Sequence, residues 1–118
     1  MPLSWAATQN NLGHALFELG EREGDTSRLQ EAAAAYQAAL EERTRKNLPI
    51  GWAKSLRNHG KVLVSLAERG DDLDMAERAL SELTDAFEAI GASGIPINAD
   101  EEILLERASG LVRRLEGR

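Results

Sequence analysis

Residues 2–25, PLSWAATQNNLGHALFELGEREGD, return 47 positions later as residues 49–72, PIGWAKSLRNHGKVLVSLAERGDD. Carried along the chain without a gap, this offset pairs thirteen identical residues: Pro2/Pro49, Trp5/Trp52, Ala6/Ala53, Asn11/Asn58, Gly13/Gly60, Leu16/Leu63, Leu19/Leu66, Glu21/Glu68, Arg22/Arg69, Asp25/Asp72, Ala32/Ala79, Ala39/Ala86 and Glu41/Glu88. Pro96 continues the proline series at the same interval. Self-similarity at a fixed interval is typical of repeat proteins, in which each unit stacks on the next.

Each unit has the pattern of two helices separated by a turn. The first helix of the first unit is expected to bury an apolar face formed by Trp5, Leu12, Leu16 and Leu19. Asp25 is a candidate N-cap for the second helix. In that helix, Leu29, Ala32, Ala33, Tyr36 and Leu40 stand at i, i+3, i+4, i+7 and i+11, the spacing expected of one buried stripe. By the same register, His59 takes the place of Leu12 in the second unit, and we expect it to be at least half buried.

The third unit is incomplete and predicts a single closing helix. Asn98 is its candidate N-cap, and Glu101 stands where a capping box needs it. One apolar side and one charged side are typical of a helix that closes a repeat stack against water. The sequence therefore predicts five helices and no strand, at residues 4–20, 25–46, 50–69, 72–91 and 98–116.

Composition and charge exclude several classes of function. The 118 residues carry a formal net charge of −6, which is unfavourable for nonspecific binding to nucleic acid. There is no cysteine, so disulfides and thiolate metal sites are absent. No apolar run approaches the ~20 residues that span a bilayer, and no basic segment precedes an apolar run at the N-terminus. We expect a cytoplasmic protein that binds neither nucleic acid nor membranes.

No pattern of catalytic or cofactor-binding residues is present. His14 and His59 are the only histidines, and no HExxH motif supplies a metal site. Neither a Ser-His-Asp pattern nor a glycine-rich phosphate loop occurs. We therefore expect no enzyme activity, no metal and no cofactor.

The small and aromatic residues of the first unit resemble the tetratricopeptide repeat signature. The pair Leu12-Gly13 is followed by Leu16, and the second helix carries Ala32, Tyr36 and Ala39. The second unit has the matching residues Gly60, Leu63, Ala79, Leu83 and Ala86. The usual tetratricopeptide unit has 34 residues, so this is a longer variant. The resemblance implies an all-α, right-handed solenoid in one domain: helical hairpins at about 2–47 and 49–94, and a capping helix at about 98–116.

The resemblance also implies where a ligand binds. Stacked hairpins curve, and the first helix of each lines a concave groove that holds a peptide or a partner helix. The residues expected there are Asn10, His14, Phe17, Lys54, Arg57, Asn58, Lys61 and Val64. Lys54, Arg57 and Lys61 are spaced i, i+3 and i+7, so three cations share one helical face. This arrangement favours an acidic peptide or a C-terminal carboxylate as the ligand.

Several interpretations stay open at this level. Trp5 and Trp52 suit either a binding surface or packing on a preceding helix, and their repetition favours packing. Asn58 suits either a hydrogen bond between helices or a grip on a peptide backbone. The expected role is a protein-binding scaffold or adaptor. The alternatives are a structural, self-associating segment of a longer array and a regulatory domain of a larger protein.

Overall fold

The computed structural model describes residues 2–117, with the side chains of residues 5–117. It contains five helices: α1 (Pro2–Glu23), α2 (Thr26–Glu42), α3 (Pro49–Gly70), α4 (Leu73–Ala92) and α5 (Ala99–Glu116). No strand occurs among the described residues. The all-helical class and the number of helices are therefore confirmed.

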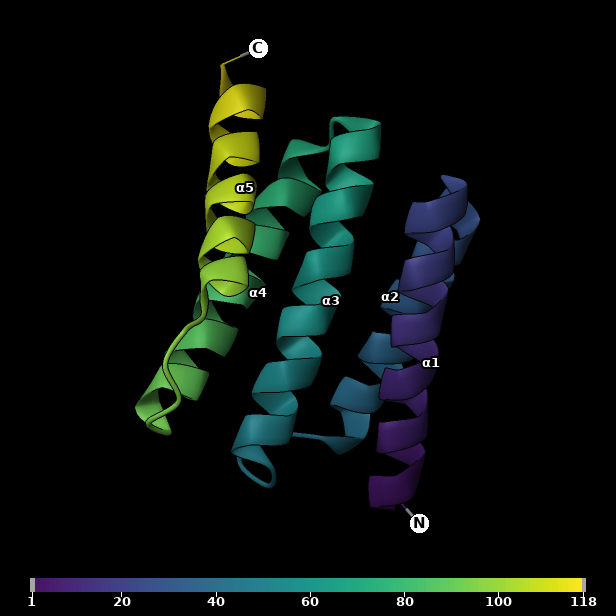
Figure 1. Ribbon diagram of the computed structural model, residues 1–118, viewed down its shortest axis with the longest axis vertical. Coiled ribbons are helices and arrows are strands. Elements are labelled where there is room, and N and C mark those ends of the chain that lie inside the picture. The colour runs from purple at the N-terminus through teal and green to yellow at the C-terminus, as the bar shows by residue number, and fades with distance from the viewer. Residues whose placement is uncertain (1, 118) are drawn as a thin grey trace.

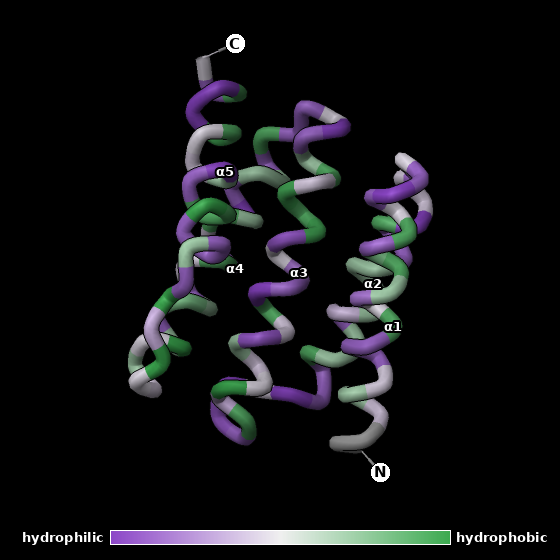
Figure 2. The backbone as a smooth tube through the Cα atoms, viewed as in Figure 1, coloured by the Kyte–Doolittle hydropathy of each residue, from purple (hydrophilic) through white to green (hydrophobic). Residues whose placement is uncertain are grey.

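The helices form two layers (Figure 1). α1, α3 and α5 lie in front, with α2 and α4 behind them. The main contacts join α1 to α2, α3 to α4, α2 to α3 and α4 to α5, whereas the front helices touch one another only slightly. Along each helix, polar and apolar residues alternate (Figure 2), as one-sided burial requires. The weak contact within the front layer leaves room between its members.

Side-chain caps begin the second, fourth and fifth helices. Asp25, Asp72 and Asn98 each accept a hydrogen bond from a backbone N–H of the first turn, at 2.9, 3.1 and 2.8 Å. Gly24 and Asp71, which are equivalent in the two units, both adopt left-handed backbone angles, with φ of 66° and 49°. The same turn thus precedes the second helix of both units, as the repeat register predicts.

Two helix ends differ from their predicted positions by three and four residues. α1 continues through Gly20, which is buried against Leu29, and ends at Glu23, just before the left-handed Gly24. Gly20 allows close contact with α2 and does not end the helix. α2 ends at Glu42 rather than near residue 46, because Arg43 turns to an extended backbone conformation. The Arg43 guanidinium donates to the hydroxyl oxygen of Ser55 at 3.2 Å, which directs the chain toward α3.

The apolar core joins the two units. Leu29 and Tyr36 of α2 pack with Val62 of α3 in one buried cluster, and Leu16 and Phe17 of α1 pack against its edge. Two further clusters lie between α3, α4 and α5. Because α2 contributes to a cluster shared with both α1 and α3, the first unit is anchored to the second by apolar burial.

The predicted buried face of α1 is also corrected. Trp5, Leu12 and Leu19 are 41%, 47% and 38% exposed. The residues that α1 buries are small ones, Ala6, Gly13 and Gly20, spaced seven apart along the side that meets α2. Small residues let the two helices approach closely, and the larger apolar residues are left on a face that no described helix covers.

Candidate functional site

A cavity of about 550 Å³ opens between the three front helices, α1, α3 and α5. Five of the eight predicted groove residues line it: Asn10, His14, Arg57, Asn58 and Lys61. They are brought together because α1 and α3 present equivalent faces in the same layer. The remaining lining residues are Asn11 of α1, Asn98 at the N-cap of α5, and five residues of α5 itself.

Three predicted groove residues are placed elsewhere. Val64 is fully buried within the core, so its predicted exposure to a ligand is wrong. Lys54 is exposed on α3 but does not line the cavity. Phe17 packs at the edge of the core, and the Lys61 ammonium lies 4.8 Å from its ring centroid. This cation–π contact makes Phe17 a support for Lys61 rather than part of the cavity wall.

The cationic side of the cavity is formed by α3. Arg57 donates to the side-chain oxygen of the adjacent Asn58, at 3.4 Å from Nε and 3.3 Å from Nη2. Neither Arg57 nor Lys61 forms an ion pair with the residues whose side chains are described. Burial raises the pKa of Tyr36 to about 12, and the Arg57 charge partly opposes this rise. These observations leave two cations beside the cavity without a carboxylate partner.

A polar network ties α1 to α3 at the floor of the site. The side-chain oxygen of Asn10 accepts from the Ser55 hydroxyl at 3.2 Å and from the Asn58 amide at 3.5 Å. Ser55 is fully buried. Asn58 therefore bonds neighbouring groups through both ends of its amide, which supports the structural interpretation of this residue. Asn11, its repeat equivalent, is exposed at the cavity.

α5 does more than close the stack, which is the only role that the sequence predicted for it. Asp100, Glu101, Ile103, Leu104 and Arg107 all line the cavity. The Oε2 atom of Glu101 is buried and has no hydrogen-bond partner among the described residues. The signal was available in Pro96, whose interval from Pro49 equals that between Pro49 and Pro2. That register makes α5 a third front helix.

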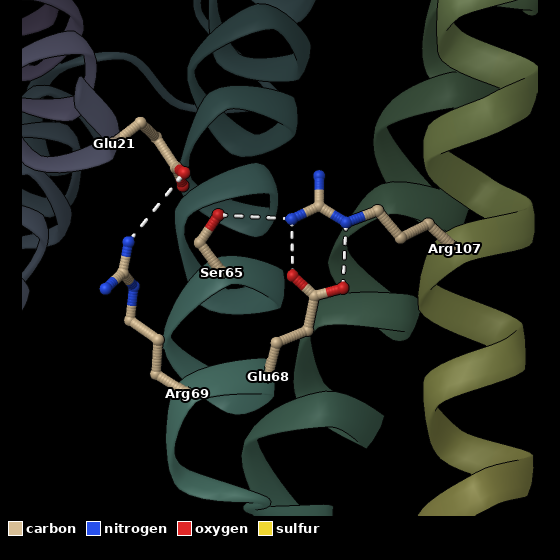
Figure 3. A network of polar contacts seen from close by, with 5 residues as sticks. All are labelled: Glu21, Ser65, Glu68, Arg69 and Arg107. Atoms are coloured by element: carbon tan, nitrogen blue, oxygen red, sulfur yellow. Dashed lines mark hydrogen bonds and ion pairs between the residues drawn. The ribbon is translucent and has the colours of Figure 1, made fainter. Parts of the chain in front are cut away.

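Ion pairs fix α5 and α1 to α3 beside the cavity (Figure 3). Arg107 of α5 binds both carboxylate oxygens of Glu68, with its Nε 2.9 Å from Oε2, and also donates to Ser65. The hydrogen bond from Arg107 holds the pKa of Glu68 below its ordinary value, although burial acts against this. On the other side of α3, Arg69 approaches Glu21 of α1 at 3.9 Å. The charge of Arg107 is therefore paired with a carboxylate, unlike the charges of Arg57 and Lys61.

His59 lies on the back of the molecule rather than in the cavity. It is 4% exposed, which confirms the predicted burial, and its Nδ1 atom lies 2.6 Å from Oε1 of Glu82. Glu82 also accepts from Arg78 at 3.0 Å. The repeat register predicted the burial of this histidine but not its carboxylate partner.

The two tryptophans differ in their surroundings. Trp52 packs against the core, and the Arg45 guanidinium lies 5.4 Å from its ring centroid. Trp5, its repeat equivalent, is exposed. The packing interpretation therefore holds for Trp52 and not for Trp5 within this chain.

Among the described residues, no group of three or more His, Asp or Glu side chains is arranged to hold a metal ion. None of the described helices combines the length and the apolar character needed to cross a membrane. Comparison of the chain with protein-family models, with curated proteins and with solved structures found no match.

Proposed function

We propose that this chain is a tetratricopeptide-like interaction module whose two helical hairpins and closing helix form a short solenoid. The close contacts at the glycines support this proposal. A Cβ atom on Gly13 would lie 2.8 Å from the Tyr36 ring, and one on Gly60 would lie 3.0 Å from Leu83. Each small residue of the signature therefore meets the large residue of the signature across its own helix pair.

The proposed ligand is a peptide or partner helix that binds in the cavity between α1, α3 and α5 and carries an acidic group. The observation that carries this proposal is the pair Arg57 and Lys61, two cations at the cavity with no ion pair among the described side chains. A ligand carboxylate would accept charge-assisted hydrogen bonds from both. In the complex, Arg57 and Lys61 would bind the ligand carboxylate in place of water.

The opposite wall adds a second requirement. Asp100 and Glu101 line the cavity from the first turn of α5. A ligand that also carries an amide or ammonium group would donate hydrogen bonds to these carboxylates. The cavity therefore favours a peptide in which an acidic group and a donor group are both present over a purely acidic polymer.

The test uses three labelled peptides of equal length. The first peptide contains several glutamate residues, a single lysine and a free C-terminal carboxylate. The second is the C-terminal amide of the first. In the third peptide, lysine replaces every glutamate. We expect the first to bind best, with an affinity that falls as salt is added. Replacing Arg57→Glu together with Lys61→Glu is expected to weaken this binding by roughly tenfold or more. Fluorescence anisotropy would measure the dissociation constants.

The matched control is another double charge reversal, Lys46→Glu with Arg113→Glu. Both residues are exposed and outside the cavity lining. This control changes net charge equally, so it separates a local contact from long-range attraction. Two results would contradict the proposal: equal affinity of the two double variants for the first peptide, or a wild-type affinity that does not depend on salt. Either result would mean that the cavity is solvated surface and that the proposed function is wrong. The alternative role, self-association, would use a different surface, the outer face of α1.

A further inference from the structure

An apolar stripe runs along the outer face of α1. Six large apolar side chains are exposed among the described residues, and three of them, Trp5, Leu12 and Leu19, lie on this one helix at intervals of seven. Thr8 and Ala15, also exposed, stand three residues after the first two. Spacings of seven and three place side chains along the seam of a two-helix pair. The stripe therefore has the pattern of a helix-packing surface.

The equivalent stripe on α3 is covered. Trp52, His59 and Leu66 take the places of Trp5, Leu12 and Leu19 in the repeat. His59 is 4% exposed, and Leu66 packs in the cluster formed with α2. Within one molecule, the same face of the repeat is thus buried by a neighbouring helix on α3 and bare on α1.

We propose that α1 pairs with α1 of a second copy of this chain, antiparallel, around a two-fold axis that passes close to Leu12. In this arrangement Leu12 meets its own counterpart, and Trp5 of each copy meets Leu19 of the other. The surface is self-complementary, as a two-fold dimer requires.

The charges of α1 favour the antiparallel arrangement. Residues 2–13 contain no Asp, Glu, Lys or Arg, whereas Glu18, Glu21, Arg22 and Glu23 all lie in the second half of the helix. Antiparallel pairing sets the acidic half of each α1 beside the uncharged half of the other. It also brings these carboxylates toward the positive end of the partner helix dipole. Parallel pairing would instead place the acidic residues beside their own copies.

A head-to-tail arrangement fits the same stripe poorly. The opposite end of the molecule presents α5, whose exposed side chains include Glu102, Glu106 and Arg113. Stacking this surface on Trp5 and Leu12 would bury charges against apolar groups without partners, which is costly. The two-fold arrangement also closes on itself, so it gives a dimer rather than a fibre.

The stripe is separate from the cavity. Leu12 precedes Gly13, which faces α2, and one residue corresponds to roughly 100° around a helix. Asn10, Asn11 and His14 are the residues of α1 that line the cavity, and none of them belongs to the stripe. Dimerisation through the stripe therefore leaves both cavities open, and it does not rest on the proposed peptide binding.

The first test is the oligomeric state of the whole chain by sedimentation velocity over a concentration series up to about 1 mM. We expect a reversible monomer–dimer equilibrium. Leu12→Lys places two like charges at the axis and should raise the dissociation constant by at least roughly tenfold. The control Ile50→Lys changes a residue of 38% exposure outside the stripe and should dimerise as the wild type does. Because Leu12 is 47% exposed, the variant should keep its helical circular dichroism.

The second test determines the orientation. The chain has no cysteine, so single thiols can be introduced cleanly. When Trp5→Cys and Leu19→Cys proteins are mixed and oxidised with oxidised glutathione, a disulfide between the two different variants should predominate. Predominance of disulfides within each variant would overturn the antiparallel arrangement. A wild type that stays monomeric throughout, or that grows beyond the dimer, would overturn the proposal, whereas Arg57→Glu with Lys61→Glu should still dimerise.

Discussion

Two glycines of this chain, Gly13 and Gly110, differ in the space around the position that a Cβ atom would occupy. At Gly13, the ring of Tyr36 occupies the space that a side chain would need, and that ring is only 2% exposed. At Gly110, in the middle of α5, the nearest atom to an added Cβ is the end of the Arg113 side chain, 3.9 Å away. The first glycine is required by packing, and the second is not.

Alanine replacement should therefore have opposite effects at these two glycines. Gly13→Ala should lower the free energy of unfolding by roughly 1–2 kcal/mol, because the buried ring must shift. Gly110→Ala should raise it by about 0.5–1 kcal/mol, through the better helix propensity of alanine. Urea denaturation followed by circular dichroism would measure both. Equal stabilisation by the two replacements would show that α1 and α2 are not in the close contact described.

The surroundings of His59 differ from those that the repeat register predicts. The repeat register places it where the first unit has Leu12, which implies an apolar environment. In the structure, the Glu82 carboxylate lies 2.6 Å from its ring. The substitution of leucine by histidine in the second unit is thus accompanied by a carboxylate on the neighbouring helix, 23 residues away in the chain.

At the level of elements, α5 depends on a contact with α3 as well as on its apolar face. Ala108 and Leu111 are buried against the second unit, and Arg107 beside them binds Glu68 of α3 through both carboxylate oxygens. The two ion-pair side chains are about one-third exposed, at 39% and 34%. The pair therefore orients α5 more than it stabilises the fold, because exposed pairs contribute little.

The Glu68–Arg107 pair predicts a specific loss of stability in acid. The folded-state pKa of Glu68 lies below its ordinary value of 4.5, mainly because of the hydrogen bond from Arg107. Its contribution is therefore present above pH 4.5 and is lost as the pH falls through the folded-state pKa. Glu68→Gln should remove this part of the pH dependence, at a cost of under about 1 kcal/mol at neutral pH.

Thermal unfolding across the acid range would measure this effect. Glu106→Gln is the matched control, since Glu106 is exposed on α5 and forms no ion pair with the described residues. It should leave the wild-type profile unchanged. A Glu68→Gln protein with the wild-type acid profile would contradict the role assigned to the pair.

Viewed as a whole, the molecule is held together across its two units by the cluster around Val62. This residue is fully buried among Leu29 and Tyr36 of the first unit. Contact between the units is also made by Asn10 and Ser55 in the polar network. Coupling of this kind favours unfolding in one transition, because neither unit buries its shared face alone.

We therefore predict a single cooperative transition that both units share. Trp5→Phe leaves Trp52 as the only fluorescent tryptophan, and Trp52→Phe leaves Trp5, so the two variants report on the second and first units separately. Their denaturation curves should each coincide with the loss of circular dichroism. Val62→Ala, added to either variant, should lower stability by roughly 1–3 kcal/mol without separating the curves. Two distinct midpoints would show that the units unfold independently.

Periodicity and repetition in the sequence predicted most of the local structure, apart from the ends of α1 and α2. The 47-residue register predicted five helices and the caps at Asp25 and Asn98, because caps and turns depend on residues close in the chain. The resemblance to tetratricopeptide repeats implied that Asn10, Arg57 and Lys61 share a groove, and all three line the cavity. Helix periods, caps and turns are local properties that recur in each repeated unit, so a single sequence is enough to predict them.

Only the tertiary structure decided which neighbour covers each face. Apolar spacing identified a stripe on α1 containing Leu12, but α2 packs on the small residues beside it, so the stripe is exposed. The resemblance placed Val64 in the groove, whereas packing in the cluster formed with α4 and α5 buries it. Arg107 joined the cavity because α5 docks beside α3. A helical period determines that a face is apolar, but the partner that buries it is set by contacts between residues distant in the chain.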